Sequence, residues 1–160
     1  MNPMTHRIAI AQIDMHWTTR ENVQSIARAL KTAHDQGAAI CAFSELAVTG
    51  FHRQIAREAL PEIVGAAIRQ VQDECARLSM GAAVGAPTFS GDMKFISHLL
   101  IDQGGGISAT VCKQGLTQAE ATFFQRGTSR PVGKMHGLRC SAVICREVED
   151  IEQVSQELPH

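Results

Sequence analysis

The sequence lacks the patterns that mark several common classes of protein. No C-x-x-C pair occurs among its five cysteines, and their odd number argues against a disulfide framework or a zinc ribbon. The seven histidines are scattered without an H-x-x-x-H or similar ligand pattern, so we predict no metal site. Free thiols without such patterns are typical of a protein from the reducing cytoplasm.

The chain also has no excess of positive or negative charge and no long hydrophobic run. Its formal net charge is −1 and no long basic run appears, so we expect no nucleic-acid partner. Apolar stretches such as "GAAICAF" are too short to span a bilayer, and we expect no membrane partner. The N-terminal "MNPMTHRIAIAQ" lacks a charged region followed by a long apolar segment and a cleavage site, which predicts a protein that is not secreted.

What the chain does have is enough apolar sequence for one domain. Its 160 residues are 44% hydrophobic and 19% charged, which predicts a single soluble globular domain over residues 1–160. Along the chain, segments whose apolar residues suit a strand alternate with segments whose apolar residues recur at helical spacing. Residues 114–135 show neither pattern and are predicted to be irregular. This order indicates a layered α/β domain rather than a helical bundle or a β-sandwich. The expected strands are 7–13, 38–43, 81–87, 94–102, 106–113 and 138–145, and the expected helices are 19–35, 60–80 and 147–158.

Three reactive side chains stand at the ends of predicted strands. Glu45 follows one strand, Lys113 closes a second and Cys145 closes the last. Because active sites of α/β sheets gather beyond the carboxyl ends of the strands, we expect these side chains to meet. A lysine lowers the pKa of a thiol, and a carboxylate can take its proton and later give it to a leaving amine. The lysine and the backbone N–H just after the cysteine could hold a developing oxyanion.

Each of these residues also has a structural explanation. A glutamate after a strand is usually solvated, and a lysine at a strand end often protects an edge. Free cysteine is among the most buried residue types, and Cys75 recurs at helical spacing as a core residue. Spacing alone therefore favours the structural interpretation of Cys145.

Three motifs change this balance. "FSELAVTGF" (43–51) resembles the F-P-E-L-x-x-T-G-Y signature of the nitrilase, or carbon–nitrogen hydrolase, superfamily. "CKQGL" (112–116) with "EATFFQRG" (120–127) resembles its Y-R-K-x-x-L…E…F-x-x-G segment, and "SAVICREVED" (141–150) resembles its G-x-x-I-C-Y-D segment. The three motifs occur in the family's order, and the opening strand and helix are similar as well. On these motifs the chain is identified as a member of the superfamily.

The resemblance implies a fold, a reaction and a set of roles. The family folds as an α-β-β-α sandwich and hydrolyses amide, carbamoyl or nitrile groups through a cysteine thioester, without metal or cofactor. Carried over to this sequence, Glu45 is the general base and acid, Lys113 stabilises the oxyanion and Cys145 is the nucleophile. Glu120 matches the family's second glutamate, and the backbone N–H of Arg146 completes the oxyanion hole.

The sequence departs from the family pattern in three places and in its length. Ser44 stands where the family has proline, Arg146 stands where an aromatic residue follows the nucleophile, and Glu147 stands where the family often has aspartate. The resemblance covers only the first part of the family's domain, since members are commonly close to twice this length. We therefore expect an uncovered sheet face, and a homodimer or higher assembly that covers it.

Two other functions are open at this point. The chain could be a catalytically inert half-domain that acts as an assembly or interaction module. It could also be an unrelated flavodoxin-like binding domain, but no G-x-G-x-x-G or P-loop pattern follows any predicted strand. "QGGG" (103–106) precedes a strand and predicts a hairpin turn instead.

Overall fold

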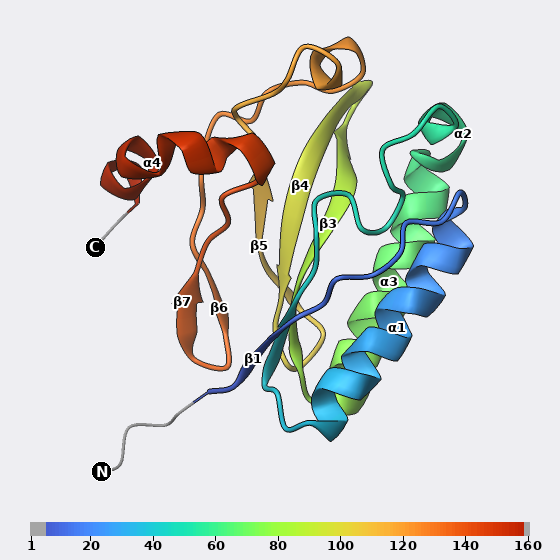
Figure 1. Ribbon diagram of the computed structural model, residues 1–160, viewed down its shortest axis with the longest axis vertical. Helices are drawn as coiled ribbons and strands as arrows, with labels where there is room; N and C mark the ends of the chain where they lie inside the picture. Colours follow the sequence, from blue (N-terminus) through green and yellow to red (C-terminus); the bar gives the residue numbers. More distant parts are fainter. Residues whose placement is uncertain (1–5, 159–160) are drawn as a thin grey trace.

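The computed structural model describes residues 6–158, which form a five-stranded sheet with helices on one face (Figure 1). The strand order is β1-β2-β3-β4-β5; β1, β2 and β3 pair in parallel, and β4 pairs antiparallel with both β3 and β5. The carboxyl ends of β1, β2, β3 and β5 therefore lie at the same edge of the sheet. The strands are β1 Ile8–Ile10, β2 Ile40–Ala42, β3 Gly81–Ser90, β4 Met93–Ile101 and β5 Ile107–Cys112.

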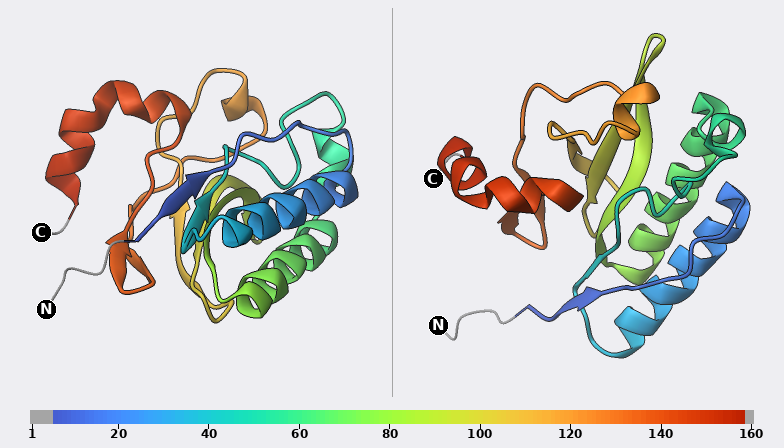
Figure 2. Two further views of the ribbon diagram at one scale, coloured as in Figure 1. Left: turned by 60° about the horizontal axis from the view of Figure 1, so that its bottom comes forward. Right: turned by 45° about the horizontal axis from the view of Figure 1, so that its top comes forward.

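Two long helices, α1 (Thr19–Asp35) and α3 (Pro61–Leu78), cover one face of this sheet (Figures 1 and 2). As predicted, α1 begins after Thr18, whose hydroxyl accepts a hydrogen bond from the Glu21 N–H at 3.3 Å. Both helices bury one apolar stripe against the sheet. Cys75 is fully buried in this core, which confirms its structural role.

The other face of the sheet carries a hairpin of β6 (Gly133–Met135) and β7 (Leu138–Cys140). Met135 packs there against residues of β2, β4 and β5, namely Ile40, Leu100, Ala109 and Val111. The hairpin does not cover the edge strand β1, where Ile8 is 55% exposed and Ile10 is 86% exposed. The predicted α/β layering is confirmed, with helices on one side and a second, small sheet on the other.

The predicted last strand, residues 138–145, is wrong in its extent. Strand β7 ends at Cys140 and pairs with β6, outside the five-stranded sheet. The Ile144 N–H donates to the Glu147 carboxylate at 2.9 Å rather than to a neighbouring strand. Cys145 therefore begins a 3-10 helix, η2 (Cys145–Asp150), which leads into α4 (Ile151–Glu157), where one helix over 147–158 is predicted.

The remaining elements agree with the predictions in part, and strand β6 begins at Gly133, inside the segment 114–135 that is predicted to be irregular. The β4–β5 hairpin is confirmed, and the Asp102 carboxylate accepts hydrogen bonds from the Gly104 and Gly106 N–H groups in its turn. Strand β3 continues past Pro87 to Ser90 and forms a second hairpin with β4, which the apolar run "GAAVGAP" does not reveal. Two short helices, α2 (Ile55–Glu58) and η1 (Glu120–Thr122), complete the fold. Within residues 6–158 no helix is long and apolar enough to cross a membrane.

Candidate active site

Lys113 is the centre of a buried cluster of charges. It follows β5, where its N–H donates to the Ile96 carbonyl and its own carbonyl accepts from the Gly127 N–H, both at 2.8 Å. Its side chain is fully buried. The Nζ atom donates to Glu45 Oε1 at 2.6 Å and to Glu120 Oε1 at 2.8 Å. An ammonium group with two carboxylate partners is strongly held, so its position is fixed.

Glu45 reaches this cluster by a different route from the one predicted. We expect neighbouring strand ends to meet, but β3 and β4 separate β2 from β5. The segment after β2 crosses β3 instead, and the Val48 N–H donates to the Gly85 carbonyl at 3.0 Å. A Cβ atom on Gly85 would lie 2.4 Å from the Leu46 nitrogen, so only glycine allows this crossing. The predicted meeting of Glu45 and Lys113 is present, and the backbone approach at Gly85 produces it.

Glu120 lies at the start of η1 and is held by its own turn. Its Oε2 atom accepts the Thr117 N–H at 2.8 Å, and its own N–H donates to the Thr117 hydroxyl at 3.3 Å. Burial raises the pKa of Glu120, but the hydrogen bonds from Lys113 and Thr117 outweigh burial and hold the pKa below its usual range. Burial lowers the pKa of Lys113, and the two carboxylates outweigh it and hold that pKa above its usual range. Lys113 and Glu120 are therefore both charged at neutral pH.

Cys145 sits on a turn with a left-handed backbone, at φ 53°. Few residues other than glycine adopt this conformation, and those that do are often found at functional sites. Burial raises the pKa of the thiol, and the charge of Glu45 and its hydrogen bond to the thiol raise it further. Lys113 and the Arg146 N–H lower it, but by less. The predicted effect of the lysine, a lower thiol pKa, is therefore present, but burial and Glu45 outweigh it and the net shift of the pKa is upward.

The structure therefore brings the predicted residues Glu45, Lys113, Glu120 and Cys145 together. The Arg146 backbone N–H lowers the pKa of the Cys145 thiol, whereas the Arg146 side chain is exposed and lies 3.7 Å from Glu149. A neutral thiol beside a carboxylate can lose its proton as it attacks, and a nearby cation and N–H can stabilise negative charge on oxygen.

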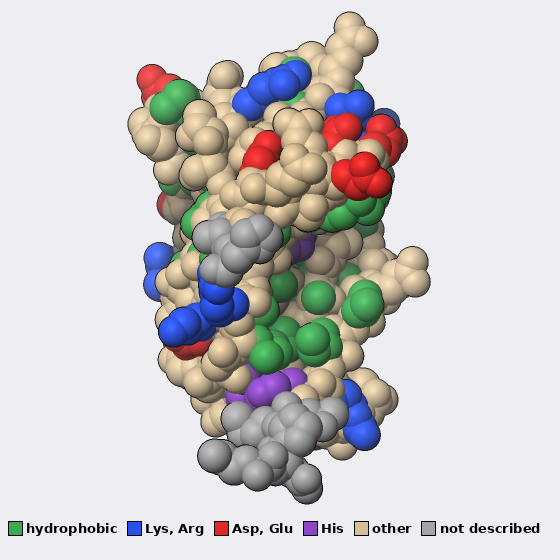
Figure 3. All heavy atoms as spheres, turned by 90° about the vertical axis from the view of Figure 1, so that its left-hand side faces the viewer, with side chains coloured by type: hydrophobic (Ala, Val, Ile, Leu, Met, Phe, Trp, Pro, Cys, Tyr) green, Lys and Arg blue, Asp and Glu red, His purple; other side chains and the backbone are tan. Residues whose placement is uncertain are grey.

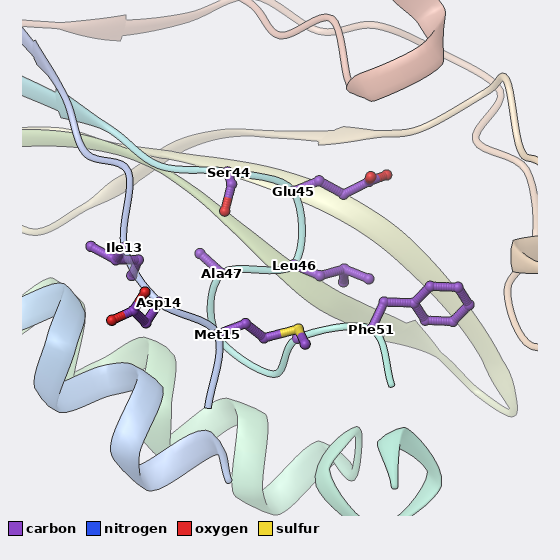
Figure 4. A pocket seen from close by; sticks show the side chains of 9 residues that line it. Ile13, Asp14, Met15, Ser44, Glu45, Leu46, Ala47 and Phe51 are labelled. Atoms are coloured by element: carbon purple, nitrogen blue, oxygen red, sulfur yellow. The ribbon is translucent and has the colours of Figure 1, made fainter. Parts of the chain in front are cut away.

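A cavity of about 180 Å³ lies beside the Glu45 segment (Figure 4). Figure 4 shows the Glu45 side chain pointing away from Asp14 and Met15, two other residues that line this cavity. It is lined by Ile13, Asp14, Met15, Ser44, Glu45, Leu46, Ala47, Gly50 and Phe51. In the described part of the chain, no group of three or more His, Cys, Asp or Glu side chains is arranged to hold a metal ion.

A buried ion pair and a buried histidine near the site were not predicted. Arg130 and Glu147 form an ion pair of 3.1 Å, with each side chain 3% exposed. His98 donates from Nε2 to the Phe43 carbonyl at 3.0 Å, just before Glu45. In the sequence, Glu147 is visible only as a glutamate at a position where the family often has aspartate. No local pattern marks Arg130 or His98.

An α/β sheet that brings a glutamate, a lysine and a cysteine together has the arrangement used by enzymes with a thiol nucleophile. The comparisons with known proteins narrow this class. The carbon-nitrogen hydrolase family model matches residues 7–154, and the chain belongs to this family. A search of curated proteins finds no significant match.

Solved structures of an amidase from Nesterenkonia sp. AN1 are similar to this chain. The NitN amidase is 26% identical with a TM-score of 0.85, and the match covers 94% of this chain and 61% of the amidase. A variant carrying the acetamide moiety of fluoroacetamide on its active-site cysteine is 25% identical with a TM-score of 0.85, covering 95% and 60%. A cysteine-to-alanine variant in complex with butyramide is 26% identical with a TM-score of 0.78, covering 85% and 54%. The chain spans about 60% of the length of these amidases.

Proposed function

We propose that this chain hydrolyses the C–N bond of a small amide through a thioester on Cys145. The observation that carries the proposal is the ion pair of 2.6 Å between the Glu45 carboxylate and the buried Lys113 ammonium, beside a thiol, that of Cys145, whose pKa the same carboxylate raises. A base, a cation and a nucleophile gathered at one site are the parts that acyl transfer requires. Membership of the carbon-nitrogen hydrolase family supports the same reaction.

In the first half-reaction the Cys145 sulfur attacks the amide carbon while Glu45 takes the thiol proton. Because the pKa of this thiol is raised, the proton leaves during the attack rather than before it. The oxyanion of the tetrahedral intermediate accepts hydrogen bonds from the Lys113 ammonium and from the Arg146 N–H. Lys113 donates to two carboxylates and retains a third N–H for this purpose.

The first half-reaction ends when the C–N bond of the intermediate breaks and Glu45 gives its proton to the departing ammonia. This leaves a thioester between Cys145 and the acyl group. Water then attacks the thioester carbon while Glu45 takes its proton, and collapse of the second intermediate releases a carboxylic acid. The proton returns to the Cys145 sulfur, so the site is regenerated. In this scheme Glu120 holds Lys113 in place through a second ion pair, of 2.8 Å.

The substrate class we propose is a small aliphatic amide. The similar amidase from Nesterenkonia sp. AN1 has been solved with butyramide and with the acetamide moiety of fluoroacetamide on its cysteine. The superfamily also acts on carbamoyl compounds and nitriles, so the test below includes one of each.

The test is ammonia release from acetamide, butyramide, a carbamoyl compound and a nitrile. We expect release from the amides by the wild-type chain and none by Cys145→Ala. Cys140→Ala, which removes a half-buried thiol from β7, is the matched control and should keep the activity. Amide turnover that persists in Cys145→Ala, or no turnover of any substrate by the folded wild type, would contradict the proposal.

A second candidate function is an assembly module without turnover, and one surface favours association. Figure 3 shows hydrophobic side chains gathered in a hollow on the side of the molecule that carries α4 and the β6–β7 hairpin. The edge strand β1 adds Ile8 and Ile10, whose side chains are more than half exposed. Exposed apolar surface beside an unpaired strand favours pairing with another chain.

We propose that a second copy of this chain covers the exposed side of β1. Sedimentation at micromolar concentration should give a dimer or larger species, and Ile10→Lys should shift it toward the monomer. A wild-type monomer at that concentration would contradict this part of the proposal. The inert module is favoured instead if the wild type associates but releases no ammonia.

A further inference from the structure

We propose that Arg130 and Glu147 are positioning residues, which tie the Cys145 turn to the end of β5 and so set the distance between the nucleophile and Lys113. The inference rests on the proposed role of Cys145 as the nucleophile. No contact of Arg130 or Glu147 with the reacting atoms is required, because both act through the backbone on either side of the site.

The Glu147 carboxylate joins the two segments directly. Its Oε1 atom accepts the Gln114 N–H at 2.6 Å and the Gly115 N–H at 3.1 Å, just after Lys113. Its Oε2 atom accepts the Ile144 N–H at 2.9 Å, just before Cys145. One buried carboxylate therefore holds the backbone next to Lys113 and next to Cys145 at once.

Arg130, from the loop between η1 and β6, connects a third segment to this carboxylate. Its Nη1 atom donates to Glu147 Oε2 at 3.1 Å and to the Ala142 carbonyl at 2.5 Å. Burial raises the pKa of Glu147, but the Arg130 guanidinium and the backbone N–H groups outweigh it and hold the pKa below its usual range. Glu147 is thus a charged acceptor, and each of its oxygens is bonded twice.

The Glu147 side chain packs closely against the backbone at Gly115. Gly115 lets the carboxylate approach, since a Cβ atom there would lie 3.2 Å from Glu147 Cγ. Cys145 itself is exposed and has a left-handed backbone, so the turn must be stabilised by contacts outside the cysteine. The hydrogen bond from Ile144 to Glu147 supplies such a contact directly before the turn.

The test compares alkylation of Cys145 by iodoacetamide across pH in the wild type and in Glu147→Gln. A glutamine has nearly the same shape, but its NH₂ group cannot accept the backbone N–H bonds. When the turn is released, the thiol leaves the Glu45 carboxylate that raises its pKa. We expect the labelling midpoint of Cys145 to fall toward the ordinary value of about 8.5. The kcat for amide hydrolysis should fall about 10²-fold, as expected for a displacement near 1 Å.

Three controls separate positioning from loss of the fold. The fully buried Cys41 and Cys75 report unfolding, and they should stay unlabelled in Glu147→Gln. Glu152→Gln removes the same charge from an exposed site on α4 and should leave the Cys145 midpoint unchanged. If Glu147→Gln labels Cys41 and Cys75 as well, Arg130→Met and Arg130→Lys replace it in the comparison. Arg130→Lys, which keeps the charge, should then restore part of the wild-type midpoint that Arg130→Met loses.

An unchanged Cys145 midpoint in every variant that remains folded overturns the inference. This failure is distinct from failure of the proposed function. A wild type that releases no ammonia contradicts the hydrolase proposal, whereas the labelling comparison decides the positioning role with or without turnover.

Discussion

Replacing Lys113 with methionine should strongly destabilise the fold, because it leaves two carboxylates facing each other without their cation. Glu120 has 7% of its side chain exposed and Glu45 has 21%, while Lys113 is fully buried between them. Breaking a buried ion pair by removing one partner costs about 3–5 kcal/mol. For a chain of this size that corresponds to a fall in Tm of about 6–20 °C.

The pH dependence gives the prediction a second, independent readout. In the wild type the pKa of Glu120 is held below its usual range, so the cluster stabilises the fold above the ordinary pKa of about 4.3. That contribution is lost as the pH falls through the depressed pKa. In Lys113→Met the unpaired carboxylates become neutral more easily. The difference in stability between variant and wild type should therefore be largest near neutral pH and should shrink below about pH 4.

The assay is urea unfolding of both proteins between pH 3 and 8, with Lys31→Met as the matched control. Lys31 makes an ion pair of the same 2.6 Å length with Asp35, but the two side chains are 62% and 54% exposed. Its loss should leave the midpoint within experimental error. A Lys113→Met variant as stable as Lys31→Met at pH 7, or a deficit that does not change with pH, would refute this reasoning.

Three further predictions concern the thiol, the crossing at β3 and the exposed strand. The wild-type Cys145 should be alkylated with a midpoint above the ordinary value of about 8.5, and Glu45→Gln should lower that midpoint; a wild-type midpoint well below it would contradict the assigned contacts. Gly85→Ala should destabilise the fold by about 1–3 kcal/mol in urea unfolding and abolish amide hydrolysis, because its Cβ would collide with the segment that carries Glu45. Gly65→Ala, in helix α3, is its control and should be neutral or slightly stabilising; equal effects of the two changes would exclude the steric explanation. Ile10→Lys should reduce association in sedimentation without lowering Tm, and an unchanged sedimentation profile would remove β1 from the contact.

Most of the helices and strands could be predicted because each carries a local signal. The capping pair of Thr18 and Glu21 marks the start of α1, and the apolar stripe of α3 follows Pro61. The route by which Glu45 reaches Lys113 carries no such signal. It depends on a backbone approach at Gly85, which becomes visible only when β2 and β3 lie side by side.

The end of the chain shows the other limit of local prediction. Residues 141–144 have the apolar composition of a strand, yet the Ile144 N–H bonds to Glu147. That carboxylate also accepts hydrogen bonds from Arg130 and from the backbone after Lys113, and both are distant from Glu147 in the sequence. The direction of the Cys145 pKa was missed for a similar reason. Which of Glu45 and Lys113 dominates depends on distances and burial rather than on residue type.

The most direct test of the account is a search for the acyl-enzyme on Cys145. The wild-type chain is mixed with butyramide, quenched in acid within the first turnovers and digested, and the cysteine peptides are analysed by mass spectrometry. The account predicts the butyryl mass on the Cys145 peptide alone, and its loss in Cys145→Ala. Amide hydrolysis without any acyl group on Cys145, or an acyl group on another cysteine, would contradict it.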